Sequence, residues 1–231
     1  MAERPVFMPS LKVGRLVDEV SVSFLWHKGM APSQKKKNVT ELHAAAGLRG
    51  IEPLLEVSSK SEERIGQRLS AFSLGVELEE GGVISLECAF QGSKVFENGG
   101  PFKDLFGVDS RVAKRDERLV NSGRLVGFRF EERDFPITPK TAFYDWLYIK
   151  ALFPHREFLR RLHTYAGFTD IEFNPERSIN CQARSCATYV SLDRLELLNE
   201  CVKSFDRFVE VLRPDSIEQP HSNMDRQKSM F

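Results

Sequence analysis

The sequence predicts a helix-dominated α+β domain with a few short strands. Apolar residues recur at helical spacing through most of the chain after residue 85, whereas alternating apolar and polar residues occur mainly before it. No internal repeat or long linker divides the 231 residues, so we expect one core. We assign residues 1–212 to this domain. Residues 213–231 are expected to form a flexible tail, because they are polar and contain two prolines.

Two strands and a helix are expected near the N-terminus. Alternating apolar side chains predict a strand over residues 20–26, and the short apolar run Leu54–Val57 predicts another. Between them, the apolar spacing predicts a helix that is capped by Ser33 and closed by Gly47.

A second helix and a hairpin are expected next. Ser61 is placed to cap a helix whose apolar side consists of Ile65, Leu69 and Phe72. The alternation from Phe72 to Leu78, followed by a turn at two glycines and a further apolar pair, predicts a β-hairpin.

The second half of the chain is predicted to be mostly helical. Helices are expected over residues 86–96, 110–119, 141–152, 157–165, 180–190 and 204–212. One alternating stretch, residues 126–130, predicts a further strand.

The charge balance argues against a protein that coats duplex DNA. Lys plus Arg and Asp plus Glu number 33 each, so the formal net charge is zero. The one basic cluster, Lys35-Lys36-Lys37, is typical of a solvated helix surface. A local basic pocket for one modified nucleotide remains compatible with this balance.

The sequence indicates no metal site, no membrane-spanning helix and no secretion signal. The four cysteines form no closely spaced pair and are expected to be buried free thiols, so no metal or redox cofactor is implied. No stretch approaches the roughly 18 apolar residues of a membrane helix. The N-terminus has no basic segment followed by an apolar one, so a cytoplasmic location is expected.

The segment Leu86–Phe96 carries the most informative polar residues. Glu87, Gln91 and Lys94 are spaced i, i+4 and i+7, so on an α-helix they share one narrow stripe among apolar or small neighbours. A structural ion pair on an ordinary amphipathic helix is the alternative. Against it, Glu87 and Lys94 would lie about 10 Å apart along the axis, beyond a routine helical pair.

That spacing suits a ribose held between an amine and a carboxyl group. Burial lowers the pKa of a lysine and so supplies the neutral amine that attacks an anomeric carbon and forms a Schiff base with the opened sugar. Glu87 is placed to move protons, and Gln91 to orient a sugar hydroxyl.

These residues resemble a known family. Leu86-Glu87-x-x-Phe90-Gln91-x-x-Lys94 is similar to the S-E-h-x-F-Q-x-x-K helix of the NADAR (YbiA-like) superfamily, and Ser70–Ser73 resembles its entry motif. The resemblance is closer to the NADAR antitoxins encoded beside DarT-type DNA ADP-ribosyltransferase toxins, and it spans roughly the first nine-tenths of the chain. The segments that resemble this branch are Leu55–Ser61, Ser85–Pro101, Gly123–Arg129, Lys140–Trp146 and Phe168–Ser185.

The resemblance implies a NADAR fold and an N-glycosidase that removes ADP-ribose from guanine bases in single-stranded DNA. ADP-ribose would be the product. A DarT-type toxin encoded alongside this protein would be a candidate partner. The family's acid and lysine correspond to Glu87 and Lys94, and its amide and aromatic residues to Gln91 and Phe90 as substrate-binding groups.

The chain departs from the superfamily near its C-terminal motif. YbiA-type members have an acidic residue followed by W-G-x-G, where this chain has Asp170-Ile171-Glu172-Phe173-Asn174-Pro175. Asp170 and Glu172 are assigned to the site because they lie where the superfamily has its acidic residue. The aromatic platform for the base is therefore left open among Trp146, Tyr144 and Phe173.

Further substrate contacts are expected from donors elsewhere. Lys60 and Ser61 precede a predicted helix, where backbone N–H groups favour anions. Arg129 and Arg184 are candidates for the diphosphate, with a salt bridge as the alternative for each. Asn180 is a candidate ligand or a helix cap.

Two other functions compete with this one. An N-glycosidase for small phosphorylated ribosides, of the riboflavin-precursor type, would use the same helix. A non-catalytic antitoxin would instead neutralise its toxin by binding, which requires an exposed apolar patch.

Overall fold

A computed structural model of the protein describes residues 1–12, 15–29, 31–176 and 178–212, so the expected tail at 213–231 lies outside the described residues. The structure has 44% helix and 22% strand in a single domain. This balance confirms the predicted helix-dominated α+β class. Over the described part of the chain, no helix is long and apolar enough to cross a bilayer.

A four-stranded sheet has the order β2-β1-β9-β3. Its strands are β1 (Ala2–Lys12), β2 (Arg15–Phe24), β3 (Leu54–Glu56) and β9 (Gly167–Thr169). β1 pairs antiparallel with β2 and β9, whereas β9 runs parallel to β3. The strand predicted over 20–26 is the second half of β2, and the strand predicted at 54–57 is β3.

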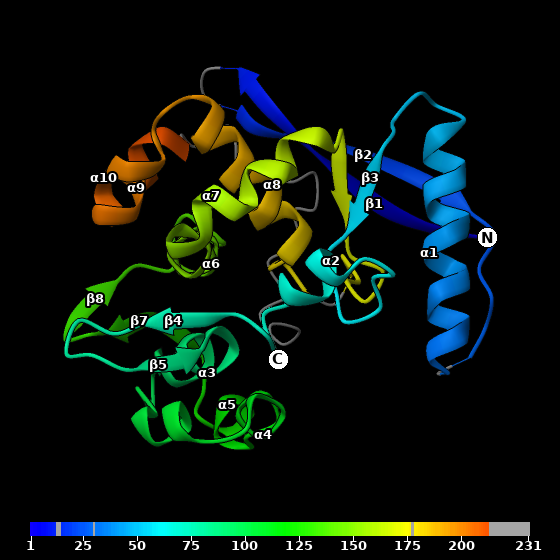
Figure 1. Ribbon diagram of the computed structural model, residues 1–231. Helices are drawn as coiled ribbons and strands as arrows, with labels where there is room; N and C mark the ends of the chain where they lie inside the picture. Colours follow the sequence, from blue (N-terminus) through cyan, green and yellow to red (C-terminus); the bar gives the residue numbers. More distant parts are fainter. Residues whose placement is uncertain (13–14, 30, 177, 213–231) are drawn as a thin grey trace.

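One helix covers each face of this sheet (Figure 1). On one face, α1 (Pro32–Gly47) packs Val39 and Leu42 against apolar residues of β1 and β2. On the other, α8 (Gln182–Arg194) is tied to the hairpin by Ser191, whose hydroxyl donates to the Leu16 carbonyl and accepts from the Ser10 N–H.

The first helix ends at Gly47 as predicted, but its predicted cap is wrong. The helix begins at Pro32 after Ala31, and no side chain caps it. Proline has a fixed φ suited to the first helical turn and lacks the N–H that a cap would have to satisfy, so Ser33 lies inside the helix.

The centre of the main core is α6 (Ala142–Leu152), which is buried on nearly every side. Phe143 stacks on Phe128 of a three-stranded sheet at 4.4 Å between ring centroids, and the Tyr148 hydroxyl donates to the Leu69 carbonyl. This sheet has the order β6-β7-β8, formed by Lys94–Phe96, Leu125–Phe130 and Arg133–Phe135. The predicted helix at 141–152 and the predicted strand at 126–130 are confirmed.

The predicted hairpin is also confirmed, as β4 (Gly75–Glu77) paired with β5 (Val83–Ser85). The helix before it, α2, spans only Arg64–Arg68 and begins after Glu63. Ser61 is not its cap, because the Ser61 hydroxyl accepts the Glu63 N–H one turn earlier. Phe72 is exposed rather than part of the apolar side.

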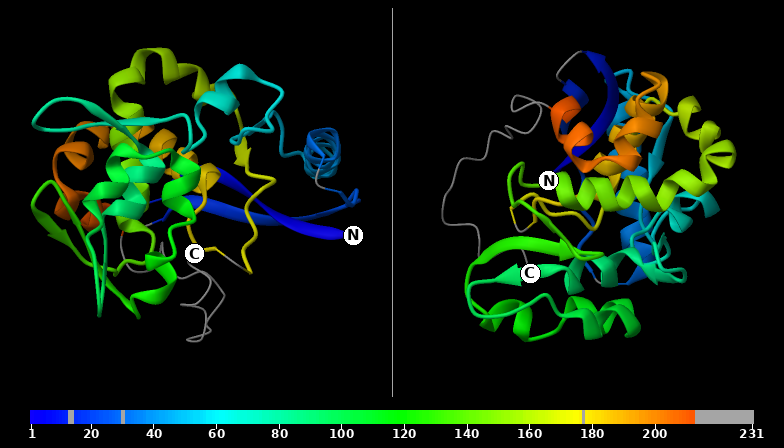
Figure 2. Two further views of the ribbon diagram at one scale, coloured as in Figure 1. Left: turned by 90° about the horizontal axis from the view of Figure 1, so that it is seen from below. Right: turned by 90° about the vertical axis from the view of Figure 1, so that its left-hand side faces the viewer.

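Short helical segments complete the chain. They are η1 (Lys103–Gly107), α4 (Ser110–Lys114), α5 (Arg118–Asn121), η2 (Phe153–His155), α7 (Arg156–Leu159), η3 (Arg160–Thr164), α9 (Leu198–Lys203) and α10 (Phe205–Leu212). Figure 2 shows α9 and α10, in orange, beside α6. The helix predicted over 110–119 is broken into α4 and α5, because Asp116 accepts the Arg118 N–H and starts a new turn.

All four cysteines are free and buried, as predicted. Cys88 lies on α3 (Leu86–Gly92), Cys186 on α8 and Cys201 on α9, and Cys181 immediately precedes α8. Burial raises the pKa of the Cys186 and Cys181 thiols, which favours their neutral form.

Candidate active site

The helix predicted over 86–96 is shorter than expected, and Lys94 does not lie on it. α3 ends at Gly92, and Lys94 is the first residue of β6. The hydrogen bonds accepted by two backbone carbonyl groups explain why the helix ends there. The Gly92 carbonyl accepts the Phe102 N–H and the Ser93 carbonyl accepts the Arg129 N–H, so neighbouring segments replace the helical bonds.

The three predicted polar side chains nevertheless lie together inside the protein. Glu87 and Gln91 are adjacent on α3, where the Gln91 amide donates to the Glu87 carboxylate at 2.8 Å. Lys94 is the cross-strand partner of Phe128, so its side chain shares the buried face of the sheet. Only 1% of Lys94 is exposed, and its Nζ lies 4.8 Å from the centroid of the Phe90 ring.

Burial sets the charge state of Lys94. Loss of solvent is the main cause that lowers the pKa of Lys94 to about 8. The Glu87 carboxylate opposes this shift, whereas the positive charge of Lys114 adds to it. Lys114 lies on α4, half exposed, with Nζ 3.7 Å from the Glu87 carboxylate. About a tenth of the Lys94 amine is therefore neutral at pH 7, far more than for an exposed lysine.

An unused acceptor lies beside this pair. The Gln91 Oε1 is buried and has no hydrogen-bond partner among the residues that the structure describes. A buried carbonyl without a partner is costly, so a bound hydroxyl or amide would stabilise it.

Tyr144 links α3 to a second acidic group. Its ring packs edge-on against Phe90 at 5.0 Å between centroids. Burial raises the pKa of Tyr144 well above its ordinary value, and the charges of Glu87 and Asp170 act in the same direction. The phenol is therefore a neutral donor that lies within the field of both carboxyl groups.

Asp170 follows β9 and is buried. Its carboxylate accepts the N–H groups of Glu172 and Phe173 and the amide of Gln182. Burial outweighs these bonds and raises the pKa of Asp170 to about 6. These contacts hold Asp170 in one orientation.

Glu56 is a further buried acid, and the sequence analysis missed it. The Ser58 hydroxyl, the Thr169 hydroxyl and the Ile171 N–H all donate to it. Burial, with the charge of Asp170, raises the pKa of Glu56 to about 8. The signal was an acid inside the short apolar run that predicted β3.

Residues 2–222 match the family described as DarT1-associated NADAR antitoxin. The chain belongs to this family. The match confirms the NADAR resemblance, and the family name reports an association with the DarT1 toxin. None of the curated proteins compared with the chain matches it.

In this member of the NADAR family, the loop after β3 lies next to Asp170. The Lys60 ammonium donates to Ser59 and lies 3.9 Å from the Glu172 carboxylate, so two predicted residues meet at a partly exposed rim. Ser61 is buried and serves the turn before α2. Asn180 is not the cap of α8, because Cys181 takes that position. The buried Oδ1 of Asn180 has no hydrogen-bond partner in the described part of this NADAR chain.

Two predicted binding residues are instead engaged in other contacts of the NADAR fold. Arg129 pairs with Asp134 on the exposed face of β7, opposite to Phe128. Arg184 is held in the core by Asp145 and by the Thr141 hydroxyl. These pairs are the salt bridges that the sequence left as the alternative for each arginine.

Two candidate aromatic platforms are also part of the core. Trp146 donates its Nε1–H to the Cys201 carbonyl and packs against Phe205, on the side of α6 opposite to Tyr144. Phe173 is buried against Phe7. Tyr144 is the candidate that meets Phe90, and hence the Lys94 cluster of this NADAR chain.

Proposed function

We propose that the protein is an N-glycosidase that removes ADP-ribose from guanine bases in DNA and so reverses the modification made by a DarT-type toxin. The observation that carries this proposal is a buried lysine whose pKa is lowered to about 8, adjacent to a buried acid and amide. Family membership supports the substrate, because the family is described as an antitoxin associated with DarT1.

The first step uses the neutral amine of Lys94 as a nucleophile. The amine attacks the anomeric carbon of the ribose, and the bond between this carbon and the guanine nitrogen breaks. The electron pair of that bond goes to the base, which takes a proton that the Glu87 carboxylate relays from the Lys94 nitrogen, positively charged after its attack. The base leaves as unmodified guanine in the DNA strand.

The second step releases the sugar. The ring oxygen leaves the anomeric carbon and gains a proton, while the Lys94 nitrogen loses one and forms the C=N bond of a Schiff base. Water adds to this carbon and gives a proton to the Glu87 carboxylate. Departure of the Lys94 amine then yields free ADP-ribose, so the overall reaction consumes one water.

Neighbouring residues bind and orient the substrate in this proposal. The buried Gln91 Oε1 accepts from a ribose hydroxyl, which satisfies an otherwise unpaired acceptor. Phe90 and Tyr144 form the apolar wall that lowers the pKa of Lys94 by excluding water. Asp170, Asn180, Lys60 and Glu172 contact the remainder of the nucleotide.

An oligonucleotide that carries ADP-ribosylated guanine tests the reaction and the substrate together. The protein should release ADP-ribose and restore the unmodified strand, as measured by mass spectrometry. Borohydride added during turnover should trap a reduced adduct on Lys94, and Lys94→Arg should be inactive because a guanidinium remains charged.

Three outcomes would contradict the proposal. Full turnover by Lys94→Arg would exclude the nucleophile. Hydrolysis of small phosphorylated ribosides in preference to the modified oligonucleotide would favour the riboflavin-precursor activity. Protection of toxin-expressing cells by a Lys94→Arg, Glu87→Gln variant would favour an antitoxin that works by binding alone.

A further inference from the structure

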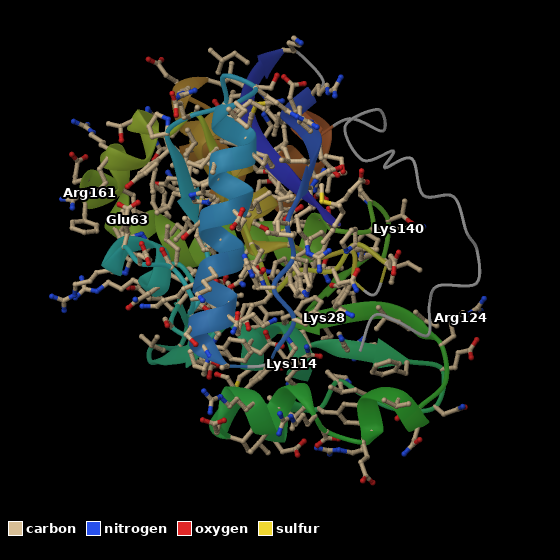
Figure 3. All side chains as sticks on the ribbon, turned by 90° about the vertical axis from the view of Figure 1, so that its right-hand side faces the viewer. Lys28, Glu63, Lys114, Arg124, Lys140 and Arg161 are labelled. Carbon is tan, nitrogen blue, oxygen red and sulfur yellow. The ribbon has the colours of Figure 1, made fainter. Side chains whose placement is uncertain are left out.

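A basic surface groove lies between α2 and the α7–η3 segment. It is lined by Glu63, Arg64, Ile65, Arg68, Phe158 and Arg161. Figure 3 shows Glu63 and Arg161 together at one edge of the molecule, with Arg124 at the opposite edge. We call this surface the α2–α7 groove.

The groove carries an excess of positive charge. Arg64, Arg68 and Arg161 form no ion pair within the described residues, whereas the neighbouring Arg156 and Arg160 both pair with Glu157. The groove's one carboxylate, Glu63, accepts a hydrogen bond from the Tyr165 hydroxyl. Three guanidinium groups therefore face solvent against a single acid that is already engaged.

An exposed aromatic ring accompanies these arginines. Phe158 is 44% exposed, and the guanidinium carbon of Arg161 lies 3.9 Å above its ring centroid. An aromatic ring with a stacked guanidinium is a surface on which a nucleobase can stack, and the neighbouring arginines suit the phosphates on either side of it.

The groove is joined to the candidate active site by a short segment that hydrogen bonds hold at both ends. α2 is followed at once by Leu69, whose carbonyl accepts from Tyr148 of the central helix. Two residues further, the Ala71 N–H donates to Gln182, and the amide of Gln182 donates to Asp170. The same segment thus positions the groove and one acid of the site.

We infer that the α2–α7 groove binds the sugar–phosphate backbone of single-stranded DNA that flanks the modified guanine, with one base stacked on Phe158. This inference rests on the proposed function, since it names the surface that holds the substrate strand. It also explains how a chain with no net charge binds DNA, because the excess charge is local.

The test measures binding of a fluorescein-labelled, unmodified oligo-dT by anisotropy over a range of salt concentrations. The triple variant Arg64→Gln, Arg68→Gln, Arg161→Gln should bind at least tenfold more weakly at 0.1 M salt. The slope of log Kd against the logarithm of the salt concentration should be smaller by about 2, because each lost phosphate contact on a single strand contributes about 0.7.

A matched triple variant controls for net charge. Arg124→Gln, Arg133→Gln, Arg207→Gln removes three exposed arginines that are each paired with a glutamate elsewhere on the surface, so DNA binding should be unchanged. Equal weakening by the two triple variants, or no weakening by the groove variant, would overturn the inference. Both variants should keep the wild-type Tm, since every changed side chain is exposed.

Phe158→Ala separates stacking from charge. It should weaken binding of oligo-dT but not of an abasic strand of equal length, and it should leave the salt slope unchanged. Equal weakening for both strands would argue against base stacking. Binding of poly-glutamate that is as tight and as arginine-dependent as that of oligo-dT would show a general acceptor of acidic surfaces and would also overturn the inference.

Hydrolysis assays distinguish this inference from the proposed function. With an ADP-ribosylated oligonucleotide the groove variant should raise KM, and with ADP-ribosylated deoxyguanosine it should match the wild type. If the wild type hydrolyses neither substrate, the proposed function fails, while the oligo-dT titration still decides whether the groove binds DNA.

Discussion

A lysine buried among aromatic rings is an unusual residue, because an ammonium group loses most of its hydration there. The phenyl ring of Phe90 lies below the Lys94 nitrogen, and the opposing carboxylate of Glu87 only partly offsets the loss of water. The outcome is a base that titrates close to neutral pH rather than near its ordinary value.

The rate of hydrolysis should follow this titration. With a Lys94 pKa of about 8, roughly one lysine in ten is neutral at pH 7. We expect kcat at saturating substrate to rise about tenfold per pH unit from pH 6 to 7 and to level off above pH 8. A rate that is flat from pH 6 to 9 would contradict a lysine nucleophile. Stopped time points analysed by mass spectrometry measure this profile.

Lys114 should tune the same titration from outside. Its positive charge lowers the pKa of Lys94, so Lys114→Gln should raise that pKa and move the midpoint of the pH–rate profile to higher pH. Arg111→Gln, on the same helix, is the control and should leave the midpoint unchanged. Profiles that coincide for all three proteins would show that Lys114 has no influence on the nucleophile.

Glu56 should make the fold less stable at alkaline pH. Its pKa is raised to about 8 from an ordinary value of 4.5, so the folded protein keeps a proton that the unfolded chain has lost. The free energy of unfolding should therefore fall as pH rises toward 8. Between pH 6.5 and 8, above the titration of Asp170, the loss should be on the order of 2 kcal/mol.

Glu56→Gln should remove this dependence, because an amide does not ionise yet preserves the shape and most hydrogen bonds of the acid. Urea unfolding at pH 6.5 and pH 8 measures the difference. The same decline in both proteins would assign the pH dependence to another group.

At the scale of elements, the joint between α3 and β6 determines the site. The sequence predicted Glu87, Gln91 and Lys94 because their spacing and apolar surroundings are local features. It did not predict that the helix ends at Gly92, because the donors that end it, the N–H groups of Phe102 and Arg129, come from distant segments. Lys114 and Glu56 were missed for a similar reason, since their roles depend on neighbours that are remote in sequence.

Gly92 should tolerate no larger residue. A Cβ atom at this position would lie 2.5 Å from the Phe106 ring and 3.0 Å from the Phe102 carbonyl, so η1 would have to move. Gly92→Ala is expected to destabilise the fold by about 1–3 kcal/mol in urea unfolding. Gly107→Ala is the control in the same region, where a Cβ meets nothing within 4 Å. Equal stability of the two variants would mean that η1 adjusts without cost.

At the scale of the whole molecule, the sequence predicted the class and the elements with a clear period. α6, α8 and the β4–β5 hairpin follow local patterns. β1 was missed because Pro5 and Pro9 argue against a strand, although it lies in the middle of the four-stranded sheet. β9 has three residues and exists only through pairing with β1 and β3, which no local pattern reveals.

The separate packing of α1 predicts unequal stability within the domain. Leu42 is fully buried in the cluster between α1 and the sheet, distinct from the core around α6. Leu42→Ala should cost about 2–5 kcal/mol and should increase hydrogen exchange in α1 more than in α6. Leu48→Ala, just after α1 and 91% exposed, should change neither. An equal increase in α1 and α6 would show one cooperative unit.

Because the lysine belongs to a strand and the acid to a helix, Ser93 alone lies between the two elements. Its hydroxyl donates back to the Ala89 carbonyl, and its own carbonyl accepts from β7. A protein engineer who copies the peptide 86–96 into a helical scaffold would carry over every reactive side chain and still lose the constellation. A working graft would have to include a strand equivalent to β7. The smallest fragment that can transfer this arrangement is therefore one with tertiary structure, not a single peptide.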